Sequence, residues 1–240
     1  MPGTLDYFLG LLTILLEVGV VVCAIARGAF RRYFTINLYM GLSAVVTASR
    51  YWILFRYGLS SSHYFYFYYY SDAVLTVCLY FALMGLYATI FEDMKAESYL
   101  RFGTFLLLAG TACYSFAIVN KFSYNVVQQS APKILTHFVL EMSQNLYFVG
   151  LVLTYVLWGA IMKMGESRSR VVQLVLSLGV YFSAFAANYA LFNLYPNLQY
   201  IWAYMPPALA CLLPLAWMYA FWRLPEEARL APARLAVVPR

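Results

Sequence analysis

The residues of this chain that are best suited to chemistry are ionisable side chains inside long apolar segments. An ionisable group within a membrane span is costly, so it usually lines a binding site, a proton path or a polar contact between helices. The complete set in this chain is Glu17, Arg50, Asp72, His137 and Glu141. Together these types allow three kinds of chemistry: binding of a polar ligand, coordination of a cation and proton transfer.

A polar stripe is formed by His137, Glu141 and Asn145, or its neighbour Gln144. The spacing of four residues places these side chains on one face of a helix. Such a stripe can bind a polar ligand, hold a cation or relay a proton between imidazole and carboxylate. It can equally be an interhelical hydrogen-bond ladder that fixes packing. Both interpretations stay open here, and we expect Asn188 to complete the same polar layer.

Arg50 and Asp72 each lie one or two helical turns from the end of their apolar segments. We expect them to meet across two helices, because a buried pair neutralises both charges. For Arg50 taken alone we favour the alternative, in which it snorkels to the membrane surface beside Arg56. Glu17 has no partner that the sequence identifies. Two roles remain open for it: a protonated, hydrogen-bonded carboxyl, which we favour, or a proton-coupling acid.

An aromatic run from His63 to Asp72 leads directly into the third apolar segment. Tyrosine suits a membrane–water interface, where its ring lies in hydrocarbon and its hydroxyl stays in water. We therefore favour an interfacial belt. The density of rings leaves a second hypothesis open, in which Tyr66, Tyr69 and Tyr70 form an aromatic lid that grips an apolar or cationic molecule over the polar layer.

The elements that position these residues are predicted by hydropathy. Of the 240 residues, 64% are apolar and only 11% are charged, whereas a soluble domain carries about 25% charged residues. A spanning helix needs about 20 apolar residues. Seven segments qualify, approximately Leu5–Ala26, Tyr33–Phe55, Tyr70–Phe91, Phe102–Val119, Ile134–Met162, Val171–Phe192 and Tyr200–Trp222. If the tyrosines are helical, the third helix starts as early as Tyr64. The fold class is therefore all-α: a polytopic, seven-transmembrane helix bundle over residues 1–223, followed by a short tail, 224–240, that contains proline and arginine.

The basic residues of the loops predict the orientation of this bundle. Twelve Lys and Arg residues fall in one alternate set of loops and three in the other, and the richer set belongs on the cytoplasmic side. We therefore expect the amino terminus outside and the carboxyl terminus inside, in a multi-pass protein of the cell (inner) membrane. The richer set is Arg27, Arg31, Arg32, Lys95, Arg101, Lys163, Arg168, Arg170, Arg223, Arg229, Arg234 and Arg240.

Several functional classes are disfavoured by the inventory of residues. The basic residues lie in short loops and not on one solvated surface, so we expect no nucleic-acid partner. A retinal Schiff base needs a lysine, and the last segment has none. The two histidines allow only a weak zinc set of His137, Glu141 and Asp72. No nucleotide-binding or nucleophile-elbow motif occurs. We expect no enzyme, no catalytic residue, no metal and no cofactor.

With its aromatic entry from Tyr64 to Tyr70, the chain resembles the small seven-helix integral membrane proteins of bacteria that have no assigned activity. More distantly, it is similar to the seven-helix sensor modules that precede signalling domains in bacterial receptors. No site residue transfers from either resemblance. The tail is too short and proline-rich for an effector, which departs from the receptor pattern and predicts that a separate partner protein receives any signal.

The leading hypothesis is a membrane sensor or accessory subunit that binds a small or lipid-like ligand. The ligand would lie in an outward-facing pocket lined by Arg50, Asp72, His137, Glu141 and Asn145. The first alternative is a transporter or proton-coupled carrier that uses Glu17 and Glu141. The second is a structural subunit of a larger membrane complex.

Overall fold

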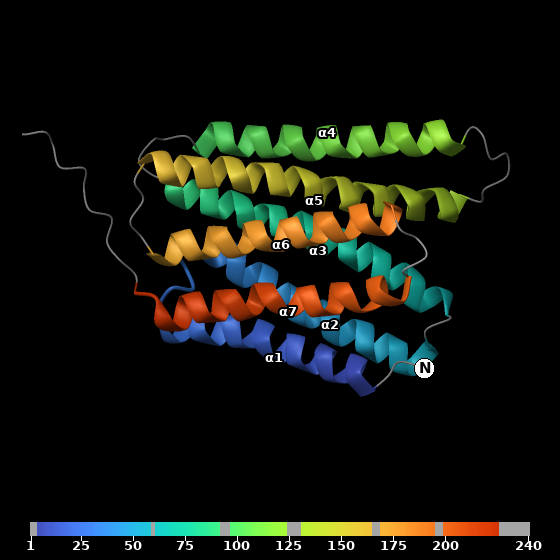
Figure 1. The fold of residues 1–240 in the computed structure, drawn as a ribbon, viewed down its shortest axis with the longest axis horizontal. Helices are drawn as coiled ribbons and strands as arrows, with labels where there is room; N and C mark the ends of the chain where they lie inside the picture. The colour runs from blue at the N-terminus through green and yellow to red at the C-terminus, as the bar shows by residue number, and fades with distance from the viewer. Residues whose placement is uncertain are drawn as a thin grey trace, which may run out of the picture.

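A computed structural model describes residues 4–58, 61–91, 97–123, 131–164, 169–194 and 199–225. These residues form seven helices that alternate in direction (Figure 1). They are α1 (Thr4–Ala26), α2 (Phe34–Tyr57), α3 (Ser62–Ile90), α4 (Glu97–Ser123), α5 (Ala131–Met164), α6 (Ser169–Leu194) and α7 (Gln199–Arg223). We call the end of the bundle with Arg27, Arg170 and Arg223 the arginine end, and the end with His63 the tyrosine end. Each of the seven segments expected from hydropathy thus corresponds to one helix.

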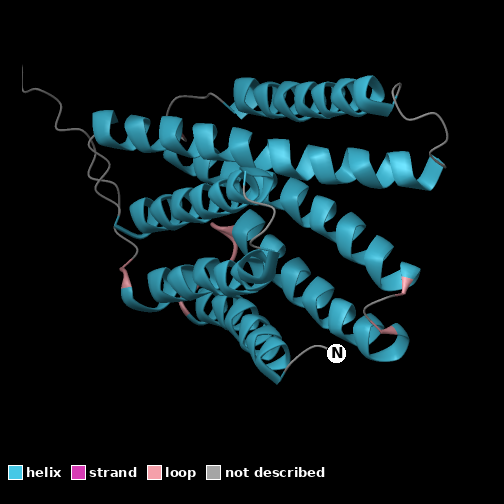
Figure 2. Cartoon of the chain, turned by 45° about the vertical axis from the view of Figure 1, so that its right-hand side comes forward, coloured by secondary structure: helices cyan, strands magenta, loops and turns pink. Residues whose placement is uncertain are grey.

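Six of the helices close into a ring in the order α1, α2, α3, α5, α6 and α7, with α7 packed back on α1. Helix α4 lies outside this ring, mainly against α5 and less closely against α3 (Figures 1 and 2). The interior that can hold buried polar groups is therefore enclosed by six helices, and α4 does not take part in enclosing it.

The bundle has an apolar core that includes a few buried polar groups, and its outer surface is largely apolar. On α1, the inward face carries Thr13, Glu17 and Val20, which are all buried, while Leu11 and Leu15 are about 60% exposed on the other face. Five of the helices are long and apolar enough to cross a membrane, and α7 contains the shorter apolar stretch Ala208–Arg223. A surface of this kind is suited to lipid, so the chain is a helical membrane protein. Its orientation in the membrane stays a prediction from the loop charges.

Helix α3 begins at Ser62, two residues before the earlier expected start at Tyr64 and eight before Tyr70. The Ser61 side chain accepts a hydrogen bond from the Tyr64 amide at 3.1 Å and so caps the helix. The tyrosine run is therefore helical. Helix α7 runs without interruption through Pro206, Pro207 and Pro214, although each proline removes a backbone donor.

Two tyrosine hydroxyls join α3 to α5. Tyr80 donates to the Leu146 carbonyl and Tyr87 to the Leu153 carbonyl, each at 2.6 Å. Both bonds span 66 residues of sequence, so the two helices run parallel and in register. The same offset places Asp72 level with Phe138, directly after His137.

The end of α7 is held by two arginines at the arginine end. Arg27 donates to the Trp222 carbonyl at 2.8 Å, and Arg170, only 4% exposed, donates to the Leu224 carbonyl at 2.6 Å. The last carbonyls of a helix have no partner within the helix and carry partial negative charge, so a cation is favoured there. The sequence analysis used these two arginines only to predict the orientation in the membrane. In the structure they also stabilise the contacts of α1 and α6 with α7.

Candidate functional site

Arg50 of α2 and Asp72 of α3 form an ion pair near the tyrosine end of the ring. The Arg50 Nη2 atom lies 3.6 Å from Asp72 Oδ1, and the two side chains are 16% and 25% exposed. The pairing predicted from the sequence is confirmed, and the snorkelling of Arg50 to the membrane surface beside Arg56 stays a prediction. Asp72 lies about three turns from the start of α3 at Ser62 and offers Arg50 an opposite charge within the bundle.

Three further contacts fix the Arg50 guanidinium. Its Nε donates to Ser71 Oγ at 2.9 Å, its Nη2 donates to the Tyr68 carbonyl at 3.1 Å, and its Cζ lies 4.3 Å from the centre of the Tyr68 ring. The Ser71 hydroxyl itself donates to the Tyr68 carbonyl at 3.0 Å. Tyr68, Ser71 and Asp72 can converge on one cation because they follow each other on a single helical turn. We call Arg50, Tyr68, Ser71 and Asp72 the Arg50 cluster.

Glu17 of α1 is buried against α2 near the middle of the ring. The Ser43 hydroxyl donates to its Oε1 at 2.5 Å, and its side chain is 4% exposed. Its other oxygen, Oε2, is buried without a hydrogen-bond partner among the described residues. The partner that the sequence could not identify is therefore a serine, and the carboxyl keeps one oxygen uncommitted.

Three buried tyrosines connect opposite sides of the ring. Tyr181 of α6 lies beside Tyr147 of α5, with ring centres 6.4 Å apart, and Tyr39 of α2 lies close to Tyr181. We call Tyr39, Tyr147 and Tyr181 the tyrosine bridge. Its three side chains are all buried inside the ring.

Ring packing supports the tyrosine bridge on both sides. Tyr147 stacks on Phe185 with ring centres 5.0 Å apart and planes inclined by 11°. Tyr39 meets Trp217 of α7 edge to face at 6.1 Å. Because such rings pack around Tyr39 and Tyr147, the bridge is surrounded mainly by apolar side chains.

The polar stripe of α5 is directed elsewhere. Asn145 Nδ2 donates to Ser115 Oγ of α4 at 3.0 Å, so at this position the stripe faces α4 and not the Arg50 cluster. Tyr147, two residues later, faces α6. Glu141 is half-buried and makes no hydrogen bond or ion pair with other residues that the structure describes. The side chain of His137 lies outside the described residues.

The remaining predicted polar residues are placed separately. Asn188 of α6 is 5% exposed, and its Oδ1 has no hydrogen-bond partner within the described ranges. Gln144 is half-buried. The structure therefore brings together Arg50 and Asp72 from the predicted set, with Glu17 further along the same interior, and directs Asn145 to a different interface.

The predicted aromatic lid is part of helix α3. Tyr66 stacks on Tyr70 with ring centres 6.3 Å apart, and Phe65 contacts Tyr69 at 4.6 Å. Tyr70 is 38% exposed, as an interfacial ring would be. The ring that contacts the cation is that of Tyr68, which the prediction omitted. Its position four residues before Asp72 was the available signal, because that spacing puts both on one helical face.

No group of three or more His, Cys, Asp or Glu side chains among the described residues is arranged to hold a metal ion. The chain matches no protein-family model, no curated protein and no solved structure. The Arg50 cluster, the tyrosine bridge and Glu17 together make up a polar interior whose groups can bind an anion, exchange hydrogen bonds and carry a proton.

Proposed function

We propose that this chain is an inner-membrane sensor or accessory subunit with seven spans, its tyrosine end outside and its arginine end in the cytoplasm. Its Arg50 cluster would bind the anionic group of a small or lipid-like ligand, and the change would pass to a separate partner protein. The proposal rests mainly on the ion pair of Arg50. This cation lies inside the bundle, and its contact with Asp72 is long, at 3.6 Å between Nη2 and Oδ1.

Arg50 has capacity for an anion beyond its present contacts. Its Nη1 makes no hydrogen bond within the part of the chain that the structure describes, and the side chain is 16% exposed. Guanidinium binds carboxylate or phosphate through two parallel hydrogen bonds, in a geometry tighter than the observed ion pair. A ligand anion would therefore compete with Asp72 for Arg50, while the Tyr68 ring would keep the guanidinium plane in place.

Release of Asp72 supplies a route for the signal. Arg50 lies on α2, the helix that also carries Ser43, which donates to Glu17, and Tyr39, which belongs to the tyrosine bridge. A change at the Arg50 cluster would thus alter the tyrosine bridge, and through Tyr39 the packing of Trp217 on α7. Helix α7 ends at the arginine end, where a cytoplasmic partner would bind.

The test is an inventory by mass spectrometry of small molecules and lipids bound to protein purified in a lipid-preserving detergent. Wild type, Arg50→Gln and Arg56→Gln are compared. Arg56 is the matched control, because it is an exposed arginine on the same helix whose side chain rests on Trp52. We expect an anionic molecule in wild type and Arg56→Gln that is missing from Arg50→Gln. Identical inventories in all three would overturn the proposal.

Glu17 favours a second candidate, a proton-coupled carrier. A buried carboxyl with one uncommitted oxygen is a group that can take up and release a proton or bind a small cation. Flux measured in reconstituted vesicles should lose its proton dependence in Glu17→Gln and keep it in Ser43→Ala, which retains the acid. The matching Glu141→Gln variant shows whether the second predicted acid takes part. The carrier hypothesis is refuted if the flux of every variant keeps the proton dependence of wild type, or if wild type itself shows no flux.

A structural subunit is distinguished by the same variants. For that class, Arg50→Gln and Glu17→Gln would change neither bound molecules nor flux. Only the amount of partner protein recovered with the chain would change.

A further inference from the structure

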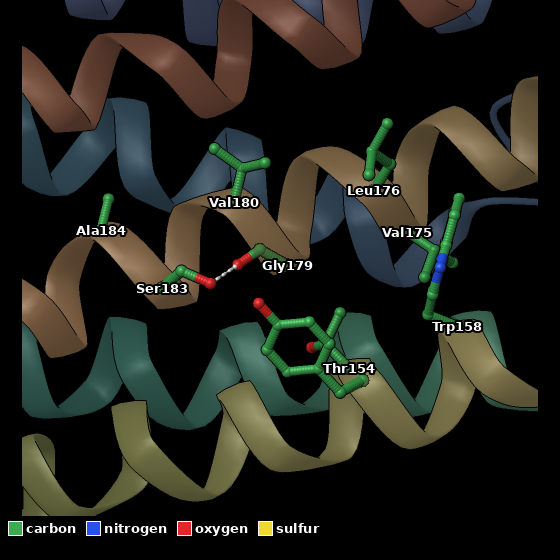
Figure 3. A pocket seen from close by; sticks show the side chains of 9 residues that line it. Thr154, Trp158, Val175, Leu176, Gly179, Val180, Ser183 and Ala184 are labelled. Carbon is green, nitrogen blue, oxygen red and sulfur yellow. Dashed lines mark hydrogen bonds between the residues drawn. The ribbon is translucent and has the colours of Figure 1, made fainter.

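Two apolar grooves flank α6 on the outer surface of the ring towards the arginine end. One lies between α5 and α6 and has a volume of about 420 Å³ (Figure 3). The other lies between α6 and α7, reaches Cys23 of α1, and has a volume of about 860 Å³. Leu176 and Val180 line both grooves, so α6 forms a ridge between two parallel channels.

The length of the grooves matches one leaflet of a membrane. Along α7 the larger groove extends from Arg223 to Leu212, which is about 16 Å of helix. Along α6 the smaller groove extends from Val175 to Ala184, which is about 14 Å. One leaflet contributes about 15 Å of hydrocarbon. Each groove can therefore hold an extended acyl chain from the membrane surface to the midplane.

The serine and threonine hydroxyls in the walls of both grooves are bonded within their own helices. Ser183 donates to the Gly179 carbonyl, as drawn in Figure 3, and Thr154 donates to the Gly150 carbonyl, both at 2.7 Å. Ser177 likewise donates to the Gln173 carbonyl at 2.9 Å. Because these hydroxyls are satisfied within their own helices, they offer little to a polar ligand and suit a hydrocarbon chain.

The polar groups lie where a lipid headgroup would be. Gln173, Trp222 and Arg223 line the arginine end of the larger groove, and Trp222 is 54% exposed. Trp158 lies beside Val175 at the corresponding end of the smaller groove (Figure 3). Tryptophan at the headgroup level and a cation at the mouth are the features expected for an anionic lipid.

We propose that this face binds one anionic phospholipid of the leaflet at the arginine end. One acyl chain lies in each groove, the two chains straddle the ridge of Leu176 and Val180, and the phosphate contacts Arg223. The site is at the opposite end of the bundle from the Arg50 cluster and does not depend on the function proposed for that cluster. Tyr181 lines the larger groove and belongs to the tyrosine bridge, so the bound chain also contacts that network.

The test is native mass spectrometry of the full chain in detergent, titrated with phosphatidylglycerol or with phosphatidylcholine of the same chains. We expect one phosphatidylglycerol per chain to be retained in preference to phosphatidylcholine. Arg223→Gln should weaken phosphatidylglycerol binding about fivefold, the usual effect of one surface cation. Arg31→Gln is the control, because it removes an exposed arginine from the same end of the bundle without touching a groove.

A second pair of variants tests the grooves themselves. Ala216→Phe fills the larger groove and should abolish the preference for phosphatidylglycerol, while Ala117→Phe on the exposed face of α4 should leave it unchanged. The proposal is overturned if wild type retains the two lipids equally. It is also overturned if the controls Arg31→Gln and Ala117→Phe lose phosphatidylglycerol as strongly as Arg223→Gln and Ala216→Phe. The same spectra report the mass of the assembly. A dimer that forms without lipid and dissociates in Ala216→Phe would assign the face to a second copy of the chain instead.

Discussion

Neutralising the two members of the Arg50–Asp72 pair, separately and together, tests whether they interact as the structure places them. Asp72→Asn leaves the Arg50 guanidinium with its contacts to Ser71 and Tyr68 but without an opposite charge. Arg50→Gln leaves the Asp72 carboxylate without its cation. Each single variant should therefore unfold more readily than wild type, whereas the double variant leaves no unpaired charge.

The expected size of the effect follows from burial. Removing one partner of a fully buried pair costs about 3–5 kcal/mol. Here the side chains are 16% and 25% exposed, so water screens part of the loss, and we expect each single variant to lower the free energy of unfolding by about 2 kcal/mol. The double variant should lose about 2–3 kcal/mol in total, which corresponds to a coupling of about 1–2 kcal/mol.

The assay is reversible unfolding in mixed micelles by increasing fractions of sodium dodecyl sulfate, followed by far-ultraviolet circular dichroism. Arg56→Gln serves as the control, and it should change the free energy of unfolding by less than about 0.5 kcal/mol because Arg56 is exposed. If the two single effects add to the double effect within about 0.5 kcal/mol, the pair does not interact and the reasoning is refuted.

Three further substitutions test the packing of the ring by the same unfolding assay. Tyr80→Phe removes the hydroxyl bond to Leu146 and should cost about 0.6–1 kcal/mol; no loss would mean that the bond between α3 and α5 does not form. Gly150→Ala would place a methyl group 2.5 Å from the buried Phe182 ring and should cost about 1–3 kcal/mol, while the same change at Gly159, which faces open space, should cost much less. Arg170→Gln removes the charged donor at the end of α7 and should cost about 1.5–3 kcal/mol; an unchanged stability would show that this cap is dispensable.

The positions of the helices could be predicted from the sequence because hydropathy and helix length are local properties. Seven apolar segments become seven helices, with bounds that differ by a few residues at most ends. The start of α3 at Ser62 lies close to Tyr64, the earlier of the two starts that the sequence left open, and the Ser61 cap marks it. The composition of the tyrosine run alone did not distinguish an interfacial loop from a helix.

The arrangement of side chains between helices was predicted less well. The pairing of Arg50 with Asp72 follows from their charges and similar depths, and the structure contains it. The direction of the α5 stripe depends on which helix is the neighbour. Because α4 lies outside the ring, Asn145 meets Ser115 there and not the Arg50 cluster. A spacing of four residues predicts that side chains share one face of a helix. It does not predict which helices are neighbours or which of them that face contacts.

Neutral partners gave no sequence signal at all. Ser43 binds Glu17, and the side chains of Tyr39, Tyr147 and Tyr181 meet inside the ring, but serines and tyrosines are common in spanning helices. Their role follows only from burial and contact in three dimensions.

The central claim is that a ligand anion competes with Asp72 for the guanidinium of Arg50. Native mass spectrometry of the anionic molecule that accompanies the purified chain tests it, by comparing the bound fraction in wild type and Asp72→Asn. Loss of the competing carboxylate should raise the bound fraction, because Asp72→Asn keeps the Ser71 and Tyr68 contacts that hold Arg50. A lower bound fraction in Asp72→Asn, in protein that remains folded, would contradict the account.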